Sequence, residues 1–117
     1  MKTSIIDFDM EKKSLIAKIP VLKSWLNPYS SMQGGMIVGA IDNAIGPLSL
    51  LVGPFNMTRK IETEYIKPIT MKLEYIYVIA TLVEQRGKRM FFEATIVDEL
   101  KKVYVKAKAT HWIIEKN

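Results

Sequence analysis

The sequence predicts an α+β fold in which one long helix packs against a curved antiparallel sheet. The first observation is an apolar and small-residue run from 34 to about 51, long enough for one core helix. The second is the stretch after residue 56, which reads as strand after strand with short turns between them. The third is the length of 117 residues without cysteine, which predicts a single domain over 1–117 that needs no disulfide.

Two short strands are expected before the helix, at residues 4–9 and 14–21, because both stretches are apolar and bounded by turn formers. The charged segment 10–13 joins them as a turn. A loop rich in turn-forming residues follows, up to the start of the helix.

Gly34 and Gly35 open the helix, which is apolar nearly all round. A helix of that kind is expected to be buried on most sides. Gly46 and Pro47 should kink it or mark a change of segment, since proline lacks the N–H that an inner helical turn uses. Residues 53–56 form the expected exit turn.

Four strands are expected after the helix, at residues 58–68, 71–85, 89–99 and 102–114. The strand at 71–85 is β-branched and aromatic on both faces, which is typical of a central strand. Residues 86–88 read as a hairpin turn, and a short charged turn precedes the last strand. The predicted element order is therefore β-β-α-β-β-β-β.

The net charge of +5 is concentrated late in the chain: residues 86–108 hold seven basic and three acidic side chains. The plain interpretation is a solvated sheet face, and the alternative is an anionic ligand such as a nucleotide-like phosphate or nucleic acid. No nucleic-acid reader motif supports the last of these. No signal peptide is expected, because the first residues hold no long apolar run. The apolar stretch at 36–52 falls short of the ~20 residues of a membrane span and is expected to be a core helix. A cytoplasmic protein without metal or cofactor is expected.

Asp42 is the unusual residue of the sequence, because it is the only charged side chain in the 35 residues from Ser24 to Thr58. An ionised carboxylate is costly to bury unless it is paired or used. It is either satisfied by local hydrogen bonds or a general base or nucleophile in a dry pocket. Exposed N–H groups at Gly34 and Gly35 could hydrogen-bond an oxyanion, which suits acyl-transfer chemistry. Within one chain these groups and Asp42 would lie ~10 Å apart, so they could instead act together across a dimer interface.

The segment that contains Asp42 resembles the hotdog-fold thioesterases of the phenylacetyl-CoA thioesterase type, a branch related to the 4-hydroxybenzoyl-CoA thioesterases. Their pattern is an Asn, a His-Gly-Gly six residues later, and an acidic residue nine positions after the His. Matching positions at these spacings are Asn27, Gly34, Gly35 and Asp42, with Gln33 in place of the His.

The resemblance extends from about Ser14 to the end of the chain. Residues 58–68 are similar to the family's strand that ends in an aromatic residue and a proline. Thr58 stands where that strand carries a Ser or Thr facing the acidic residue of the other subunit. Ser30, where the family has a glycine, is a further departure.

The resemblance implies a sheet wrapped around a helix, pairing through sheets as a homodimer or homotetramer, with active sites at the subunit interface. Asp42 would activate or orient a water, or attack the thioester directly, and Thr58 would help hold the water. The backbone N–H of Gly35 or Gly34 would polarise the thioester carbonyl. Asn27 would order the loop or the nucleophile.

Further residues of the implied site would bind the acyl-CoA substrate. The basic side chains that would meet the CoA phosphates are Arg86, Lys88 and Arg89. Most of the methionines are expected to fill the core, but Met32 and Met36 flank the glycine pair and could line an acyl pocket. Trp25 and Tyr29 could do likewise or merely cover the helix.

The glutamine at position 33, where the family has a histidine, is compatible with more than one function. A glutamine amide can donate a hydrogen bond, but it cannot shuttle a proton near neutral pH. Thioester hydrolysis through Asp42 is compatible with this, whereas a dehydratase that needs the histidine as base is not. The alternatives are a non-catalytic acyl-CoA-binding or regulatory hotdog protein, and a relative that acts on acyl-carrier protein. The sole histidine, His111, is expected to be structural.

Overall fold

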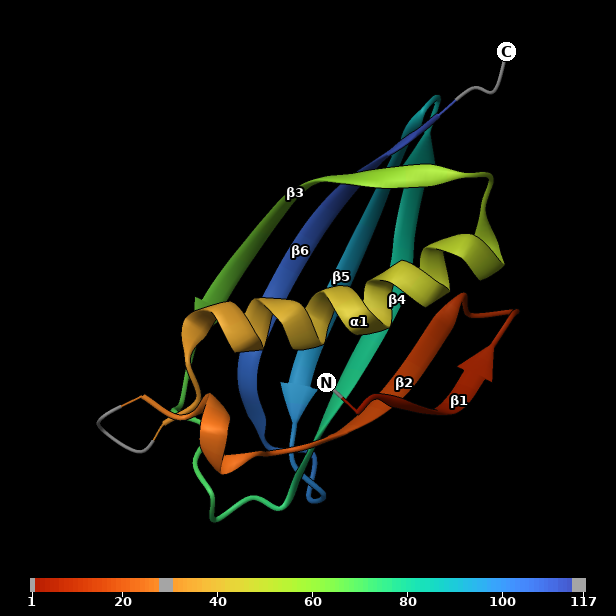
Figure 1. Ribbon diagram of the computed structural model, residues 1–117. Helices are drawn as coiled ribbons and strands as arrows, with labels where there is room; N and C mark the ends of the chain where they lie inside the picture. The colour runs from red at the N-terminus through yellow and green to blue at the C-terminus, as the bar shows by residue number, and fades with distance from the viewer. Residues whose placement is uncertain (1, 28–30, 115–117) are drawn as a thin grey trace.

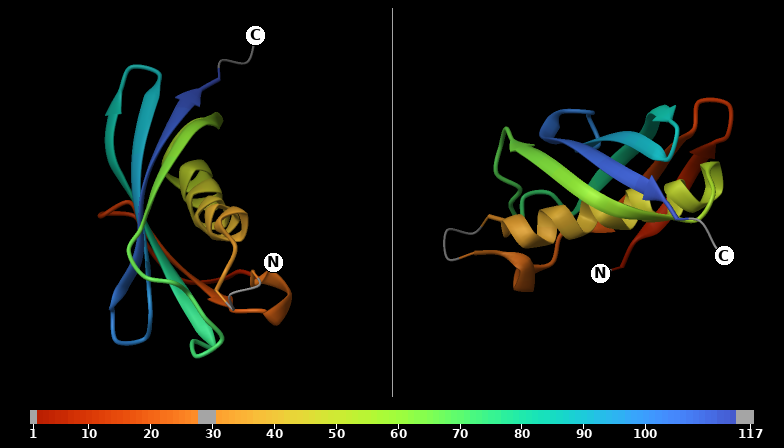
Figure 2. Two further views of the ribbon diagram at one scale, coloured as in Figure 1. Left: turned by 90° about the vertical axis from the view of Figure 1, so that its left-hand side faces the viewer. Right: turned by 90° about the horizontal axis from the view of Figure 1, so that it is seen from above.

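One helix lies across one face of a six-stranded antiparallel sheet in the computed structural model, which describes residues 2–27 and 31–114 (Figure 1). The helix is α1 (Gly34–Val52), and the strands are β1 (Ser4–Asp9), β2 (Ser14–Pro20), β3 (Asn56–Tyr65), β4 (Tyr75–Arg86), β5 (Arg89–Val97) and β6 (Val103–Ile113). The strand order is β1-β2-β4-β5-β6-β3. Views at right angles place α1 on one side of a strongly twisted sheet (Figure 2). The predicted fold class and element order are confirmed.

The strand β3 follows the helix directly and yet pairs with the last strand, so it forms one edge of the sheet. It begins two residues earlier than predicted, because Asn56 already pairs with Ile113 and its side-chain amide donates to the carbonyls of Ser49 and Pro54. A bulge between Thr58 and Lys60 then shifts the register against β6.

The turns that join β4 to β5 and β5 to β6 lie where the sequence predicted them. Gly87 has φ +57° in the two-residue turn between β4 and β5, a conformation that glycine adopts without strain. Asp98 holds the next turn, because its Oδ1 accepts the N–H groups of Leu100 and Lys102, both at 2.9 Å. The strand β4 starts at Tyr75, later than predicted, because residues 71–74 form a turn instead.

Burial of α1 differs from the expectation. The helix packs on the sheet along one stripe: Ile37, Ala40, Ile41, Ala44, Ile45, Leu48 and Ser49. On its other side, Leu50 is 62% exposed and Met36 and Leu51 are also exposed. The prediction of burial on most sides is therefore wrong for the single chain, because one sheet can cover only one side of a helix.

Pro47 lies inside α1, and the helix runs on through it to Val52, so the expected change of segment is absent. By length and composition α1 could also cross a membrane, with a hydropathy of 1.6. Its contacts are those of a core helix, since it packs against β4, β2 and β5. The inner face of the sheet, defined here as the face toward α1, supplies the rest of the core, including Leu15, Val78, Phe92 and Ile96.

Candidate functional site

Asp42 lies near the middle of α1 on the side that the sheet does not cover, and its side chain is exposed. Its neighbour Ile41 is fully buried, and one step along a helix turns the side chain by about 100°. The expected dry pocket around Asp42 is therefore not formed by the described residues of one chain. A second surface would be needed to exclude water from this carboxylate.

Thr58 near the start of β3 forms a hydrogen bond with the buried His111 of β6. Its Oγ1 lies 3.1 Å from Nε2 of His111, and Nδ1 of His111 lies 2.8 Å from Oδ1 of Asn56. Thr58 and His111 are direct partners in the β3–β6 ladder, so both side chains project from the inner face. His111 is 2% exposed and packs against the ring of Phe92, 4.8 Å between centroids.

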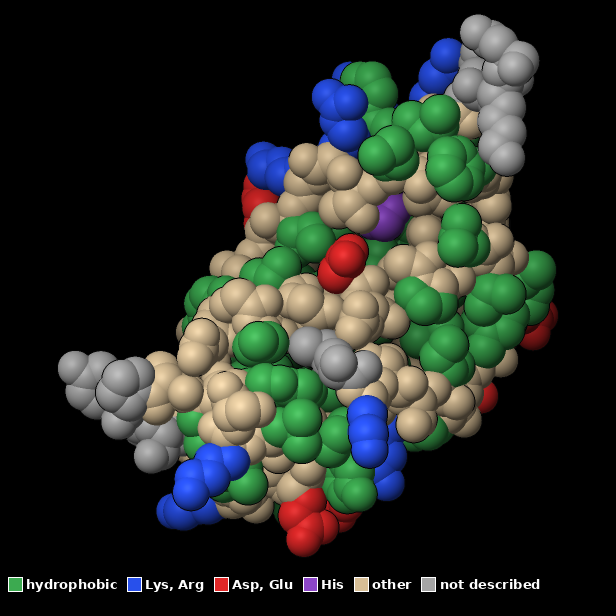
Figure 3. All heavy atoms as spheres, viewed as in Figure 1, with side chains coloured by type: hydrophobic (Ala, Val, Ile, Leu, Met, Phe, Trp, Pro, Cys, Tyr) green, Lys and Arg blue, Asp and Glu red, His purple; other side chains and the backbone are tan. Residues whose placement is uncertain are grey.

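Two opposing effects act on the imidazole. Burial lowers the pKa of His111 below its ordinary value of 6.5, because it penalises the charged form. The carboxylate of Asp42 partly offsets this by favouring the charged form. The space-filling view shows the imidazole in a hollow beside an acidic side chain (Figure 3). Asp42 thus acts electrostatically on His111, the hydrogen-bond partner of Thr58, within one chain.

A second group of predicted residues lies at the first turn of α1. A Cβ on Gly34 would approach the hydroxyl of Tyr65 to 3.3 Å, a tight contact that the glycine avoids. A Cβ on Gly35 would meet nothing within 4 Å. Space beside Gly35 is therefore open to a ligand or to another chain.

Gln33 is the N-cap of α1 and is exposed. Its side-chain Nε2 donates to the carbonyl of Leu26 at 3.4 Å, a long bond that leaves the amide able to move to another acceptor. Asn27 orders the preceding loop, since its amide pairs with Ser31 through both its oxygen and its nitrogen. Tyr29 and Ser30 lie outside the described residues.

A groove of about 370 Å³ opens beside this helix turn. It is lined by Ser31, Met32, Gly34, Ile37, Tyr65 and residues 66–69. Of the two methionines that flank the glycine pair, Met32 lines this groove and Met36 does not. Trp25 is buried in the core, and its carbonyl accepts the backbone N–H of Gln33 at 2.8 Å.

The two groups stand at opposite ends of β3 within one chain. Thr58 and Tyr65 are seven residues apart on this strand, which corresponds to about 23 Å at the rise of an extended chain. Tyr65 is the residue that touches the first turn of α1. One chain therefore cannot bring Thr58 and the Gly34–Gly35 amides to the same thioester.

The predicted phosphate-binding cations lie near Thr58, but on the outer face of the sheet. Arg89 stacks over the ring of Trp112 at 5.2 Å, and Arg86 over that of Phe91 at 5.2 Å. Phe91 on β5 and Trp112 on β6 alternate with buried inner-face residues, so both rings lie on the outer face. Lys88 occupies the turn between the two arginines.

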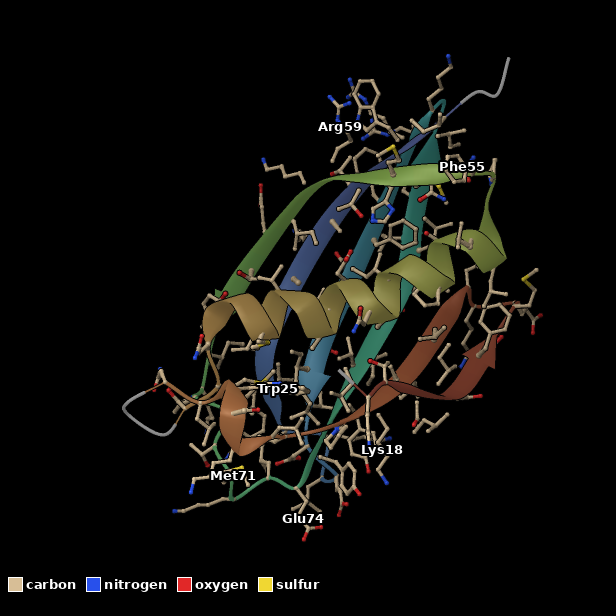
Figure 4. The ribbon with its side chains drawn as sticks, viewed as in Figure 1. Lys18, Trp25, Phe55, Arg59, Met71 and Glu74 are labelled. Carbon is tan, nitrogen blue, oxygen red and sulfur yellow. The ribbon has the colours of Figure 1, made fainter. Side chains whose placement is uncertain are left out.

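Sequence reasoning missed several residues of these two regions. Arg59, at the bulge of β3, stacks over Trp112 at 4.7 Å and projects at the same end of the sheet as Phe55 (Figure 4). Lys67 lines the groove, and the neighbouring ammonium of Lys102 lowers its pKa. Asn56 was assigned to a turn. Nothing in the sequence marked Asn56 as part of a site, because its hydrogen-bond partner His111 is 55 residues away.

Among residues 2–27 and 31–114, no three His, Asp or Glu side chains are grouped in a way that could hold a metal ion.

No family model matches the sequence, and no curated protein does so either. Solved structures resemble the chain over nearly its whole length. A Streptococcus mutans protein with bound acetyl-CoA superposes with a TM-score of 0.87 at 23% identity, covering 100% of this chain and 92% of its own. The PaaI protein of the Escherichia coli phenylacetic acid degradation operon gives 0.86 at 16% identity, covering 98% and 81%.

A hypothetical thioesterase of Streptococcus pneumoniae, solved with coenzyme A, gives a TM-score of 0.87 at 18% identity and covers 99% and 88%. Two mutants of the Streptococcus pneumoniae thioesterase replace one threonine and one aspartate by alanine, at positions sixteen residues apart. The helix on one antiparallel sheet and its match to these solved structures identify the fold: this chain has the hotdog fold.

Proposed function

We propose that this protein is a thioesterase that hydrolyses the thioester of an acyl- or aryl-CoA at a site formed by two copies of the chain. One observation carries the proposal: Thr58 and the Gly34–Gly35 turn stand at opposite ends of the exposed edge strand β3. If two β3 strands pair antiparallel, the start of one meets the end of the other. Thr58 of one chain then lies beside the glycine turn of its partner.

The comparisons support this assignment. Two of the similar proteins hold acetyl-CoA or coenzyme A. The threonine and the aspartate replaced in the Streptococcus pneumoniae thioesterase are sixteen residues apart, and so are Thr58 and Asp42.

In the proposed reaction, a water held between Asp42 and Thr58 attacks the thioester carbon. Its proton passes to the Asp42 carboxylate as the new C–O bond forms. The carbonyl oxygen takes up negative charge and accepts hydrogen bonds from the N–H of Gly35 or Gly34 and from the Gln33 amide. The C–S bond then breaks, and the CoA thiolate takes the proton back from Asp42, which leaves a carboxylic acid and free CoA.

The groove beside Gly34 would take the acyl or aryl group, since its walls include Met32, Ile37 and Ile69. CoA carries phosphates, and exposed cations lie near both ends of the site. Those near Thr58 are Arg59, Arg86, Lys88 and Arg89, and those near the groove are Lys67 and Lys102. The protein would need no metal or cofactor for this chemistry, and we place it in the cytoplasm.

The test is thiol release from a panel of acyl-CoA and aryl-CoA esters. The chain has no cysteine, so a thiol reagent reads CoA alone without background from the protein. Turnover that saturates with at least one ester and disappears in Asp42→Asn supports hydrolysis. Tight binding of the same esters without any turnover contradicts it and supports the non-catalytic acyl-CoA-binding alternative, which the replacement of the family's histidine by Gln33 favours.

A further inference from the structure

Both ring nitrogens of the buried His111 are engaged, and the partner of one of them fixes the position of the proton. Asn56 donates from Nδ2 to the carbonyls of Ser49 and Pro54, at 3.2 and 2.8 Å. These two acceptors fix the orientation of the amide, so the atom that faces the imidazole is the oxygen Oδ1. An amide oxygen only accepts hydrogen bonds. Nδ1 of His111 must therefore carry a proton and donate it across the 2.8 Å contact.

The direction of the second hydrogen bond follows from the first. A neutral imidazole has one N–H, so once Nδ1 is protonated, Nε2 can only accept. The hydroxyl of Thr58, 3.1 Å from Nε2, must then be the donor. Its single proton is committed to His111, and its oxygen can only accept hydrogen bonds from other groups.

We propose that His111 is a positioning residue, which turns the Thr58 proton inward so that Thr58 presents an acceptor to the nucleophilic water. This inference rests on the proposed hydrolase function for its catalytic consequence. A water that donates one hydrogen to Thr58 and the other to Asp42 keeps its lone pairs for the thioester carbon. A Thr58 that donated to the water would occupy a lone pair and weaken the nucleophile.

Protonation of His111 would reverse this arrangement. Nε2 would become a donor, and the Thr58 proton would have to turn toward the water or Asp42. Charged groups of both signs lie near the imidazole. Asp42 on α1 favours the protonated form. Arg59 on β3 and Arg89 on β5 are the nearby cations, and both stack over the outer-face ring of the adjacent Trp112. Burial disfavours the protonated form.

The hydrogen-bond direction can be measured without any activity. His111 is the sole histidine, so the nitrogen chemical shifts of uniformly ¹⁵N-labelled wild-type protein report one imidazole without assignment. We expect the Nδ1–H tautomer near pH 7.5. An Nε2–H tautomer, or a doubly protonated ring at that pH, would overturn the proposal.

The catalytic consequence is tested with two amide variants. In His111→Gln the side-chain oxygen can occupy the place of Nε2 and accept from Thr58 without titrating. In His111→Asn the amide can donate to Asn56 but does not reach Thr58. We expect His111→Gln to retain most of kcat, with the acidic limb of the kcat/KM profile moved to lower pH. His111→Asn should lose about tenfold to hundredfold in kcat, by analogy with the outer hydrogen-bond partners that orient metal ligands.

A double mutant separates positioning from a structural role. If His111 acts through Thr58, His111→Asn should have no further effect on kcat in a Thr58→Ala background. Additive losses, or an unchanged acidic limb in His111→Gln, would overturn the positioning role. If either variant fails to fold, the tautomer of the wild-type protein still decides the hydrogen-bond direction on which the proposal is built. Absence of turnover in the wild type overturns the hydrolase and with it the catalytic consequence, whereas the tautomer decides the hydrogen-bond direction separately.

Discussion

The hydroxyl of Thr58 lies 3.1 Å from Nε2 of His111, a residue 53 positions later in the chain. The strand order creates this contact, because the strand that follows the helix pairs with the last strand of the chain. Consequently, a histidine that the sequence presents as structural lies beside the threonine that is expected to hold the attacking water. His111 remains a buried residue, and its position links the core of the sheet to the candidate site.

Stability should depend on pH through this histidine. Burial lowers the pKa of His111 in the folded state, so the unfolded chain takes up a proton first as the pH falls below about 6.5. The stabilisation is fully present above this pH and is lost as the pH falls through the folded-state pKa. We expect the urea midpoint to fall between pH 7.5 and 5 more in wild type than in His111→Gln. Equal losses in the two proteins would show that carboxylates or other groups cause the effect.

Replacement of Asp42 should separate activity from stability. The side chain is exposed in the single chain, so Asp42→Asn should change the free energy of unfolding by no more than about 0.5 kcal/mol. The amide cannot take a proton from water, so turnover should disappear. Asn43→Asp, next to it on the helix, adds a carboxylate in the wrong place as a matched control in the Asp42→Asn background. Restored turnover in that double variant would argue against a base at position 42.

The sequence predicted the architecture well because the signals were local. The apolar run of α1, the alternation along β6 and the glycine of the hairpin turn each depend on neighbouring residues only. Register was not predictable in this way. The early start of β3 depends on Asn56 meeting β6 and the carbonyls of Ser49 and Pro54, which only the folded chain brings together.

For the site, spacing identified candidate residues but not how they are grouped. Asp42 looked buried because its neighbours are apolar, yet those neighbours turn toward the sheet and leave it exposed. The resemblance implied a site at the subunit interface, and within one chain the length of β3 separates Thr58 from Gly34. The cation–aromatic contacts of Arg59 and Trp112 gave no sequence signal, because the bulge in β3 sets which way Arg59 points.

Gln33 should contribute one hydrogen bond to the transition state. If its amide leaves the long contact with Leu26 and donates to the thioester oxygen, Gln33→Ala should lower kcat by about tenfold to a thousandfold. Gln33→His should be tolerated, since an imidazole N–H can donate at the same place. Steady-state kinetics with one acyl-CoA would measure both variants. An unchanged kcat in Gln33→Ala would mean that only backbone N–H groups donate hydrogen bonds to the thioester carbonyl.

The CoA phosphates could bind at either end of the proposed site, and two sets of variants separate the possibilities. One set replaces Arg86, Lys88 and Arg89 by alanine, and the other replaces Lys67 and Lys102. The set that contacts the phosphates should raise KM for acyl-CoA with little change in kcat, because such contacts act equally on the ground and transition states.

The same set should leave the KM for an acyl-pantetheine, which lacks the nucleotide, unchanged. Added salt should raise KM for acyl-CoA in wild type, since exposed charge contacts are screened. If neither set changes KM, the basic side chains belong to a solvated surface, and the outer-face arginines act only on the rings of Trp112 and Phe91.

Assembly through the edge strand can be tested by its charges. In an antiparallel pair of β3 strands, the inner-face residues of one copy lie opposite inner-face residues of the other. Such a pair can be centred on Ile61, Glu62 or Thr63. Centring on Ile61 places Lys60 opposite Glu62 of the second copy twice. Centring on Glu62 places Lys60 opposite Glu64 twice but also places the two Glu62 side chains opposite each other, and centring on Thr63 places Glu62 opposite Glu64 twice. The two side chains already pair within one strand at 2.6 Å, which holds them on the same face.

We therefore expect Lys60→Glu to weaken the dimer and Lys60→Glu/Glu62→Lys to restore it. Lys12→Glu, which makes the same charge change in the turn between β1 and β2, is the control and should leave assembly intact. Light scattering over a range of concentrations at low salt measures the mass against the 13.4 kDa chain. A monomer at every concentration in wild type would contradict both the β3 interface and a site shared by two chains. A dimer that tolerates Lys60→Glu would move the interface to another register or another surface, such as the exposed side of α1.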